Sequence, residues 1–316
     1  MGNTKTQFKG VLMLLLTAII WGVSFVAQSV GTDILGGFSF NGIRTLIGAV
    51  VLLPFVIYGS VKKKKGLSLS ELKEYKKTSR KEFKIGIFIG VIFCIACNAQ
   101  QYAFVYGCSS GKVAFITAMY MFIVPIIKMI SGKRIPALTI VSVIIGIAGM
   151  YFLCINPSDL STFGLGEVFA LVCAVFYALH IVFIEKYAAE CDDIKLSFTQ
   201  FAFSGIVTSV LMLVFENPTL EGIKLSVIPL LYSGVLSCGV AYTLQIVGQK
   251  YTEATVASIL MCLESVFAAI AGALLLKEYM SIREIIGACI MFSAIILSQI
   301  AQNPKFNKKT EVTSLN

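Results

Sequence analysis

Ten long apolar stretches, separated by short polar segments, dominate the pattern of hydrophobic and polar positions along the chain. They lie near residues 10–30, 38–60, 85–106, 110–131, 135–155, 164–185, 196–215, 225–249, 254–276 and 282–302. A helix needs about 20 residues to cross the ~30 Å hydrocarbon core of a bilayer. None of the stretches alternates with the period of two of a barrel strand, and a helix satisfies its own backbone hydrogen bonds in lipid. The pattern predicts an all-α polytopic membrane protein with ten transmembrane helices.

The composition supports lipid as the main surroundings of the chain. Hydrophobic residues make up 57 % and charged residues 14 %, and the mean hydropathy is +0.86. This leaves too little polar surface to cover a soluble core. The first stretch follows Lys5 and Lys9, as in a signal peptide, but it is too long and lacks a small-residue cleavage site, so we interpret it as a span.

Basic residues are distributed unevenly between the two sides of the predicted membrane protein. Twenty of the 26 Lys and Arg residues fall in the terminal segments or in connections on the same side, and ten of them lie in the segment 61–84. Because Lys and Arg in short loops favour the cytoplasm, both termini are expected there. We interpret 61–84 as a basic cytoplasmic loop that sets topology and contacts anionic lipid headgroups, rather than as a nucleic-acid site.

The two halves of the chain resemble each other weakly when one is shifted along the other. An offset of 156 aligns Trp21 with Tyr177, and an offset of 144 aligns Gln101 with Gln245. Five spans per half is an odd number, so the second half enters the membrane in the opposite orientation. We therefore expect two inverted five-helix repeats, residues 1–155 and 156–302, and a cytoplasmic tail, residues 303–316. Such repeats are typical of secondary transporters, with the substrate site near the midplane.

Four segments carry a resemblance to a known family. They are WGVSF from residue 21, NGIRTLIGAVVLLP from residue 41, VAFITAMYMFIVP from residue 113 and TEATVASILMCLESVFAAIAGALLLKEYMS from residue 252. In this order, over about residues 10–300, the chain resembles the drug/metabolite transporter superfamily in its bacterial EamA-type branch. The resemblance implies a ten-helix carrier of the bacterial cell membrane that moves small metabolites, often amino acids or their derivatives, frequently outward. Ser265 replaces the proline usual after the glutamate of the ninth span, which removes the usual cause of a kink there.

Polar and aromatic side chains inside five spans lie three or four residues apart, so within each span they share one face. Those predicted to contact a substrate are Trp21, Ser24, Gln28, Asn98, Gln101, Tyr102, Tyr177, His180, Tyr242, Gln245, Met261 and Glu264. Both halves contribute, as a pocket between two repeats requires. The alternative is that these side chains only make packing contacts and hydrogen bonds between neighbouring helices.

Glu264 has no other charged residue within ten positions along its apolar stretch. A charge at membrane depth costs ~2.5–3.5 kcal/mol on insertion scales, so it normally faces a cavity, a pathway or a partner. Glu264 and the single histidine, His180, are the predicted proton-coupling groups, with a structural hydrogen bond as the alternative for each and a cation partner as a further one for Glu264. Arg44 is expected to have a structural role, such as a pair with Glu167, and Lys112 to anchor the fourth span at the interface.

Catalytic motifs are absent from the sequence. It contains no H-E-x-x-H, P-loop or G-x-S-x-G motif, and eight of the nine cysteines fall in or at the ends of spans, where Cys94-x-x-Cys97 is interpreted as packing. We predict no enzymatic activity, metal or cofactor, and no repeated rings of charge indicate a channel. The predicted function is a secondary transporter that exports small polar metabolites. Efflux of drugs or toxic compounds, and metabolite uptake by the same fold, are the alternatives.

Overall fold

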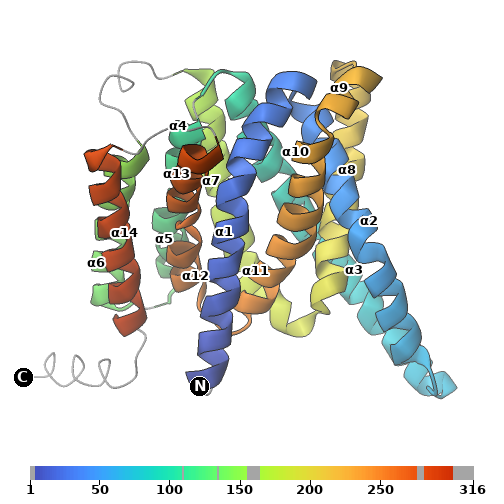
Figure 1. Cartoon of the computed structure of the whole chain (residues 1–316). Helices are drawn as coiled ribbons and strands as arrows, with labels where there is room; N and C mark the ends of the chain where they lie inside the picture. The colour runs from blue at the N-terminus through green and yellow to red at the C-terminus, as the bar shows by residue number, and fades with distance from the viewer. Residues whose placement is uncertain (1–3, 109, 134, 155–163, 276–280, 302–316) are drawn as a thin grey trace, which may run out of the picture.

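Every regular element in the described part of the chain is a helix. The computed structural model describes residues 4–108, 110–133, 135–154, 164–275 and 281–301. The first half comprises α1 (Thr4–Leu35), α2 (Gly37–Lys64), α3 (Leu69–Val105), α4 (Ser110–Thr117), α5 (Tyr120–Ile130) and α6 (Ala137–Cys154). The second half comprises α7 (Leu165–Tyr187), α8 (Asp193–Phe215), α9 (Leu220–Leu225), α10 (Val227–Leu231), a π-helical stretch (Tyr232–Ala241), α11 (Tyr242–Gln249), α12 (Ala254–Met261), α13 (Glu264–Leu275) and α14 (Ile282–Ala301) (Figure 1).

These helices form the ten predicted spans. The fourth span is α4 with α5, the eighth runs from α10 through the π-helical stretch to α11, and the ninth is α12 with α13. Eight spans are long and apolar enough to cross a membrane, and two shorter apolar helices, Ala137–Phe152 and Ile285–Ser298, supply the fifth and tenth. The expected all-α architecture with ten spans is confirmed.

The two repeats run in opposite directions. The start of α1 lies beside the end of α11, because a Cβ atom added to Gly10 would lie 2.6 Å from Thr252 Oγ1. The start of α7 lies beside the end of α3, since a Cβ atom added to Gly166 would lie 2.6 Å from Cys108 Sγ. These two places are at opposite ends of the bundle (Figure 1). The expected inversion of the two five-helix repeats is confirmed.

We call the side on which α1 begins the terminus side, and the side on which α1 ends the far side. The last span, α14, returns to the terminus side, because it runs antiparallel to α6. A Cβ atom added to Gly149 would lie 2.8 Å from Gly287 O, whereas one added to Gly146, a turn earlier in α6, would lie 3.6 Å from Ala294 Cβ, further along α14. The first and last described helices therefore both have their outer ends on the terminus side.

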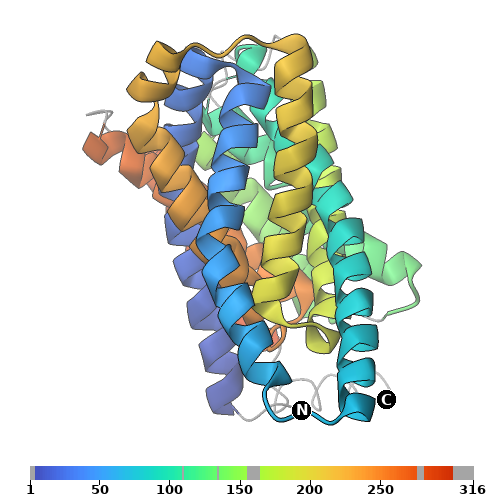
Figure 2. The same ribbon diagram turned by 90° about the vertical axis from the view of Figure 1, so that its right-hand side faces the viewer.

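Helices of the two halves interleave rather than forming separate blocks. Figure 2 shows α8 of the second half between α2 and α3 of the first half. Small residues allow this close packing: a Cβ atom on Gly42 of α2 would lie 3.1 Å from Ser209 Oγ, and one on Gly90 of α3 would lie 3.1 Å from Gln200 Cα. Small residues let helix backbones approach closely in lipid, where no hydrophobic force draws helices together.

The interpretation of 61–84 as a loop was wrong, because most of this segment is helical. α2 continues to Lys64, and α3 begins at Leu69 with a capping box in which Ser68 and Glu71 satisfy each other's backbone N–H groups. The physical reason is that Lys and Glu favour helix and Ser68 supplies a strong N-cap, so only residues 65–68 form the turn. Gly66, with φ of +85°, adopts the left-handed conformation that this turn requires.

Part of this charged segment also contacts the second half of the chain. Lys63 Nζ lies 2.6 Å from Asp192 Oδ2, Lys81 Nζ lies 2.6 Å from Glu190 Oε2, and Lys195 Nζ lies 3.1 Å from Glu82 Oε2. The helical extensions of α2 and α3 thus hold the connection between α7 and α8 on the terminus side.

Candidate functional site

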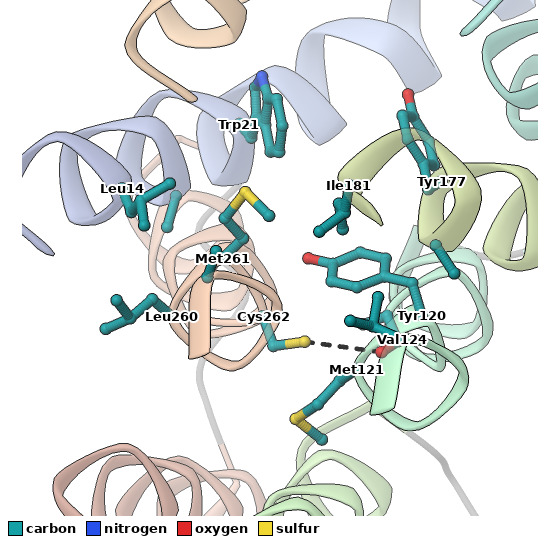
Figure 3. Close-up of a cluster of buried hydrophobic side chains, with 14 of the residues drawn as sticks. Leu14, Trp21, Tyr120, Met121, Val124, Tyr177, Ile181, Leu260, Met261 and Cys262 are labelled. Carbon is teal, nitrogen blue, oxygen red and sulfur yellow. Dashed lines mark hydrogen bonds between the residues drawn. The ribbon is translucent and has the colours of Figure 1, made fainter. Parts of the chain in front are cut away.

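The fourth and ninth spans are both interrupted, at equivalent positions of the two repeats. The four-residue hydrogen-bond step of the helix shortens to three residues at Ala118–Met119 in the fourth span and at Cys262–Leu263 in the ninth. Residues 118 and 262 are separated by the same offset of 144 that aligns the repeats in the sequence. The two interruptions touch, because Cys262 Sγ donates to Ala118 O at 3.6 Å (Figure 3).

The interruption of the ninth span does not need the missing proline. It falls directly before Glu264, where Leu263 N bonds Leu260 O at 3.2 Å and Ser265 N bonds Cys262 O at 3.1 Å. Interrupted helices at the repeat interface are the usual construction of a midplane binding site in transporters with inverted repeats.

A small cavity lies beside these interruptions, with about 20 Å³ open to a water-sized sphere. Both halves line it in nearly equal measure. The lining residues are Trp21, Phe25, Gln28, Arg44, Gln100, Thr117 and Tyr120 from the first half, and Tyr177, Ile181, Ser237, Tyr242, Gln245 and Glu264 from the second. Each of these residues is at most 8 % exposed, so the cavity lies among buried side chains inside the helix bundle.

Aromatic rings form one wall of the cavity. The rings of Trp21 and Tyr242 lie 4.5 Å apart between centroids, and the hydroxyl groups of Tyr177 and Tyr242 are 2.6 Å apart. Cys97 Sγ lies 3.1 Å from the Tyr177 hydroxyl and helps to fix the position of this hydroxyl. The aromatic wall joins α1 of the first half to α7 and α11 of the second, so an apolar group can pack against both repeats.

Several polar atoms of the cavity side chains are buried without a hydrogen-bond partner. These are Trp21 Nε1, Gln28 Oε1 and Gln245 Oε1. Buried polar groups in proteins are almost always hydrogen-bonded, so such atoms mark places where water or a ligand completes the bonding. Beside the cavity, Trp21, Gln28 and Gln245 each therefore hold one polar atom without a partner.

A carboxyl group and a guanidinium group face the cavity, those of Glu264 and Arg44. Glu264 Oε1 accepts from the Tyr120 hydroxyl at 3.0 Å, and Figure 3 shows this hydroxyl directed between Met261 and Ile181. Arg44 Nε donates to Asn41 Oδ1 at 3.0 Å. The suggested pair of Arg44 with Glu167 is not among the described contacts, and Glu167 instead accepts from Gly164 N at the start of α7.

Six of the twelve predicted contact residues line the cavity: Trp21, Gln28, Tyr177, Tyr242, Gln245 and Glu264. The other six lie in contacts between helices. Ser24 lies against Ser233, Asn98 bonds Asn41 and Thr208, Gln101 bonds Thr32, Tyr102 bonds Glu216, His180 bonds Gln200, and Met261 lies in the hydrophobic core. The Lys112 side chain lies outside the described residues.

Sequence reasoning missed Phe25, Gln100, Thr117, Tyr120, Ile181 and Ser237 and gave Arg44 a structural role only. Two signals for them were present. Phe25 lies four residues after Trp21 on the same face of α1, and Tyr120 is the position in the first repeat that corresponds to Glu264 at the offset of 144. Nothing in the sequence marks Gln100 or Ser237 as a cavity residue. Each lies next to other polar residues of its span, and spacing alone does not show which of these neighbours faces the cavity.

An ion-pair cluster between the halves, formed by Lys128, Glu185 and Glu253, lies on the terminus side of the cavity. Lys128 of α5 is only 2 % exposed, and its Nζ lies 3.0 Å from Glu185 Oε1 of α7 and 2.5 Å from Glu253 Oε1 before α12. Glu185 follows the cavity residue Ile181 by one turn of α7, about 6 Å. The cluster therefore lies between the cavity and the terminus side.

On the far side, Glu216 joins the end of α8 to the start of α2. Its carboxylate accepts from Phe38 N at 3.0 Å, from Ser39 N at 2.7 Å and from Ser39 Oγ at 2.6 Å. An anion at a helix N-terminus satisfies free N–H groups and interacts favourably with the helix dipole. Gly36, with φ of +87°, leaves room for it, since a Cβ atom there would lie 3.0 Å from the carboxyl carbon.

Two inverted repeats with a buried cavity beside their interrupted spans are the usual construction of a membrane transporter. The EamA-like transporter family model matches residues 8–155 and again residues 164–299, once for each repeat. The chain belongs to the EamA-like transporter family. It is a transporter rather than an enzyme.

Similar proteins cover almost the whole chain. An uncharacterized transporter of Archaeoglobus fulgidus is 28 % identical over 287 residues, which is 90 % of this chain and 84 % of that protein. An uncharacterized transporter of Clostridium kluyveri is 26 % identical over 97 % of both chains. A crystal structure of a protein with 14 % sequence identity superposes with a TM-score of 0.70, covering 95 % of this chain and 98 % of the other, and supports the fold alone.

Proposed function

We propose that this transporter exports small polar metabolites, such as amino acids or their derivatives, by alternating access. The observation that carries the proposal is the buried cavity that both repeats line, with contacts between the repeats on either side of it. Secondary transporters with inverted repeats bind substrate near the midplane and open alternately to either side. The aromatic wall and the free polar atoms provide the mixture of surfaces that small-molecule sites commonly have.

Alternating access requires one closure to break while the other holds. The Lys128 cluster consists of Lys128, Glu185 and Glu253, and the Glu216 cluster consists of Glu216, Phe38 and Ser39. They share no residue and lie at opposite ends of the bundle, so each can open without the other. Substrate binding favours one arrangement only to the extent that it binds that arrangement more tightly.

The orientation that we propose has both termini in the cytoplasm of the cell. The segment 61–84 carries ten basic residues on the terminus side, and basic residues favour the cytoplasmic side. Those that make no ion pair suit contact with anionic lipid headgroups. In this orientation the Lys128 cluster closes the cytoplasmic side and the Glu216 cluster closes the outer side.

The test is transport by the purified protein in liposomes loaded with the twenty common amino acids, each radiolabelled in turn. A carrier gives saturable efflux and counterflow, in which unlabelled substrate on one side accelerates movement of the label from the other. Liposomes without protein give the background rate. Flux that rises linearly with concentration and shows no counterflow indicates a channel and contradicts the proposal, as does the absence of flux above background for every amino acid.

A further inference from the structure

Arg44 carries a buried charge without a carboxylate partner among the described residues. Its side chain is 2 % exposed, in the part of α2 that lies within the bundle. The contacts of its guanidinium group are the hydrogen bond from Nε to Asn41 Oδ1 and the ring of Phe40, 5.9 Å from Cζ. A guanidinium has five N–H donors, so most of them are not used by these contacts. Buried charges are normally paired, because removing an ion from water costs several kcal/mol.

Glu264 faces the same cavity but does not neutralise Arg44. No ion pair between them occurs among the described contacts, and Glu264 is instead bonded by the Tyr120 hydroxyl. The cavity therefore presents a free guanidinium, from the first repeat, and a carboxyl group, from the second. The free amide oxygens of Gln28 and Gln245 add acceptors without adding charge.

We infer that Arg44 binds the carboxylate of a zwitterionic α-amino acid and thereby selects the substrate. A guanidinium matches a carboxylate in two parallel hydrogen bonds, which gives both strength and direction. The amide oxygens and Glu264 accept from the ammonium group, and the aromatic wall contacts the side chain. The inference rests on the proposed function and sharpens it, since a compound without a free carboxylate leaves Arg44 unpaired in the cavity.

The structural alternative is that Arg44 only holds α2 in place through Asn41 and Phe40. The two roles differ in ligand selectivity, because a purely structural arginine does not distinguish an amino acid from its amide. The comparison therefore uses the twenty common α-amino acids and their α-amides, which keep the ammonium group and side chain but lack the carboxylate.

The experiment measures thermal stabilisation of the purified full-length protein by each compound and counterflow of the compounds that stabilise it. In wild-type protein, at least one amino acid stabilises more than its amide does. Arg44→Gln weakens binding of that amino acid about tenfold to a hundredfold, the usual effect of losing a charged hydrogen-bond partner. Arg44→Lys keeps the charge but not the paired geometry, and it recovers part of the affinity.

Arg283→Gln is the matched control, because it removes the same charge from α14, where Arg283 lies over the rings of Tyr151 and Phe152. This variant keeps wild-type selectivity. The inference is overturned if no amino acid stabilises the wild-type protein more than its amide, or if Arg44→Gln folds with an unchanged Tm and keeps the preference. Counterflow of amides at the same rate as amino acids overturns it while leaving the proposed transport intact. Absence of all saturable flux instead rejects the proposed function.

Discussion

Tyr120 and Glu264 occupy equivalent positions of the two inverted repeats and are hydrogen-bonded to each other, with 3.0 Å between Tyr120 Oη and Glu264 Oε1. Ala118 and Cys262, two residues earlier in each repeat, also touch. Equivalent residues of two repeats related by a twofold axis can meet only near that axis. Glu264 therefore lies close to the centre of the molecule, beside the two interrupted spans, where the two repeats contact each other.

Glu264→Gln tests proton coupling at this position. Glutamine keeps the size of the side chain and accepts from Tyr120, but it cannot ionise. If Glu264 carries a proton in the cycle, the variant inserts and folds, yet flux in liposomes no longer responds to an imposed pH gradient. A glutamine variant with wild-type pH dependence would show that Glu264 is a structural hydrogen-bonding group.

Glu264→Ala and Tyr120→Phe are the companions of this test. Alanine leaves Tyr120 without its acceptor and opens a cavity, so the Tm falls whichever role Glu264 has. Tyr120→Phe removes only the hydroxyl and leaves Glu264 able to ionise. If Glu264 carries the proton, flux through this variant still responds to the pH gradient.

Gln245→Ala tests whether the cavity is the substrate site. Gln245 Oε1 is buried without a partner, and Gln245 Nε2 donates to Gln249 at 3.0 Å. Removing a group that bonds substrate raises KM about fivefold or more without preventing insertion, because a neutral hydrogen bond is worth about 1 kcal/mol. The measurement is the concentration dependence of counterflow.

Gln200→Ala is the control for this prediction. Gln200 is equally buried, but it bonds His180 outside the cavity. Its loss lowers the Tm and leaves KM unchanged. If both variants raise KM equally, the cavity beside the interrupted spans is not the site that the substrate occupies.

The fold was predictable from the sequence because lipid imposes one strong rule, that each apolar stretch of about 20 residues becomes a helix. The interruptions were harder to predict. Pro125 lies inside α5, after the interruption at Ala118–Met119, and the ninth span is interrupted at Cys262 without a proline. Helix propensity and the capping box at Ser68 could have predicted that 61–84 is mostly helical. The many charges of this segment were instead interpreted as a sign of a loop.

About half of the residues that line the cavity could be predicted from the sequence. The others could not, for a geometric reason. A polar side chain within a span is costly in lipid whether it meets a ligand or another helix, so hydropathy alone does not separate Gln245, at the cavity, from Asn98, which bonds Asn41 and Thr208. Tyr120 was missed because its partner belongs to the other repeat. Only the placement of one repeat against the other reveals such pairs.

Lys128→Met tests the closure on the terminus side. The substitution keeps the length of the side chain and removes the charge that both Glu185 and Glu253 face. The free energy of unfolding falls by about 1.5–3 kcal/mol, the usual worth of hydrogen bonds to charged groups, because Lys128 is fully enclosed. The measurement is thermal or denaturant unfolding of the purified protein.

Lys133→Met provides the matched control. Lys133 Nζ also faces Glu185, at 3.7 Å, but its side chain is 61 % exposed. Exposed ion pairs contribute little, so this variant unfolds like the wild type. Equal losses in the two variants would mean that the enclosed position of Lys128 has no special role in closing the cavity.

Asp192 at the start of α8 links stability to pH on the terminus side. Burial opposes its ionisation, but hydrogen bonds from Lys63 Nζ and Lys195 N outweigh burial and hold the pKa of Asp192 below its usual value. A carboxyl group with a lowered folded pKa stabilises the protein above its unfolded pKa of about 3.9, and this contribution disappears as the pH falls through the folded pKa. Asp192→Asn keeps the N-cap acceptor and loses the charge, so at pH 7 it costs about 0.5 kcal/mol, as expected for a half-exposed pair.

The measurement for Asp192 is the Tm of wild type and variant between pH 3 and pH 7. The gap between the two Tm values narrows as the pH falls below about 3.9, because Asp192 of the unfolded wild type then binds a proton. Lys63→Gln gives the same loss at pH 7, and combining it with Asp192→Asn adds nothing further, since each substitution removes the same pair. Asp192→Ala lowers the Tm further at every pH, because it also removes the N-cap. A gap between wild type and Asp192→Asn that stays constant down to pH 3 would show that packing, rather than the charge of Asp192, joins the α2 extension to α8.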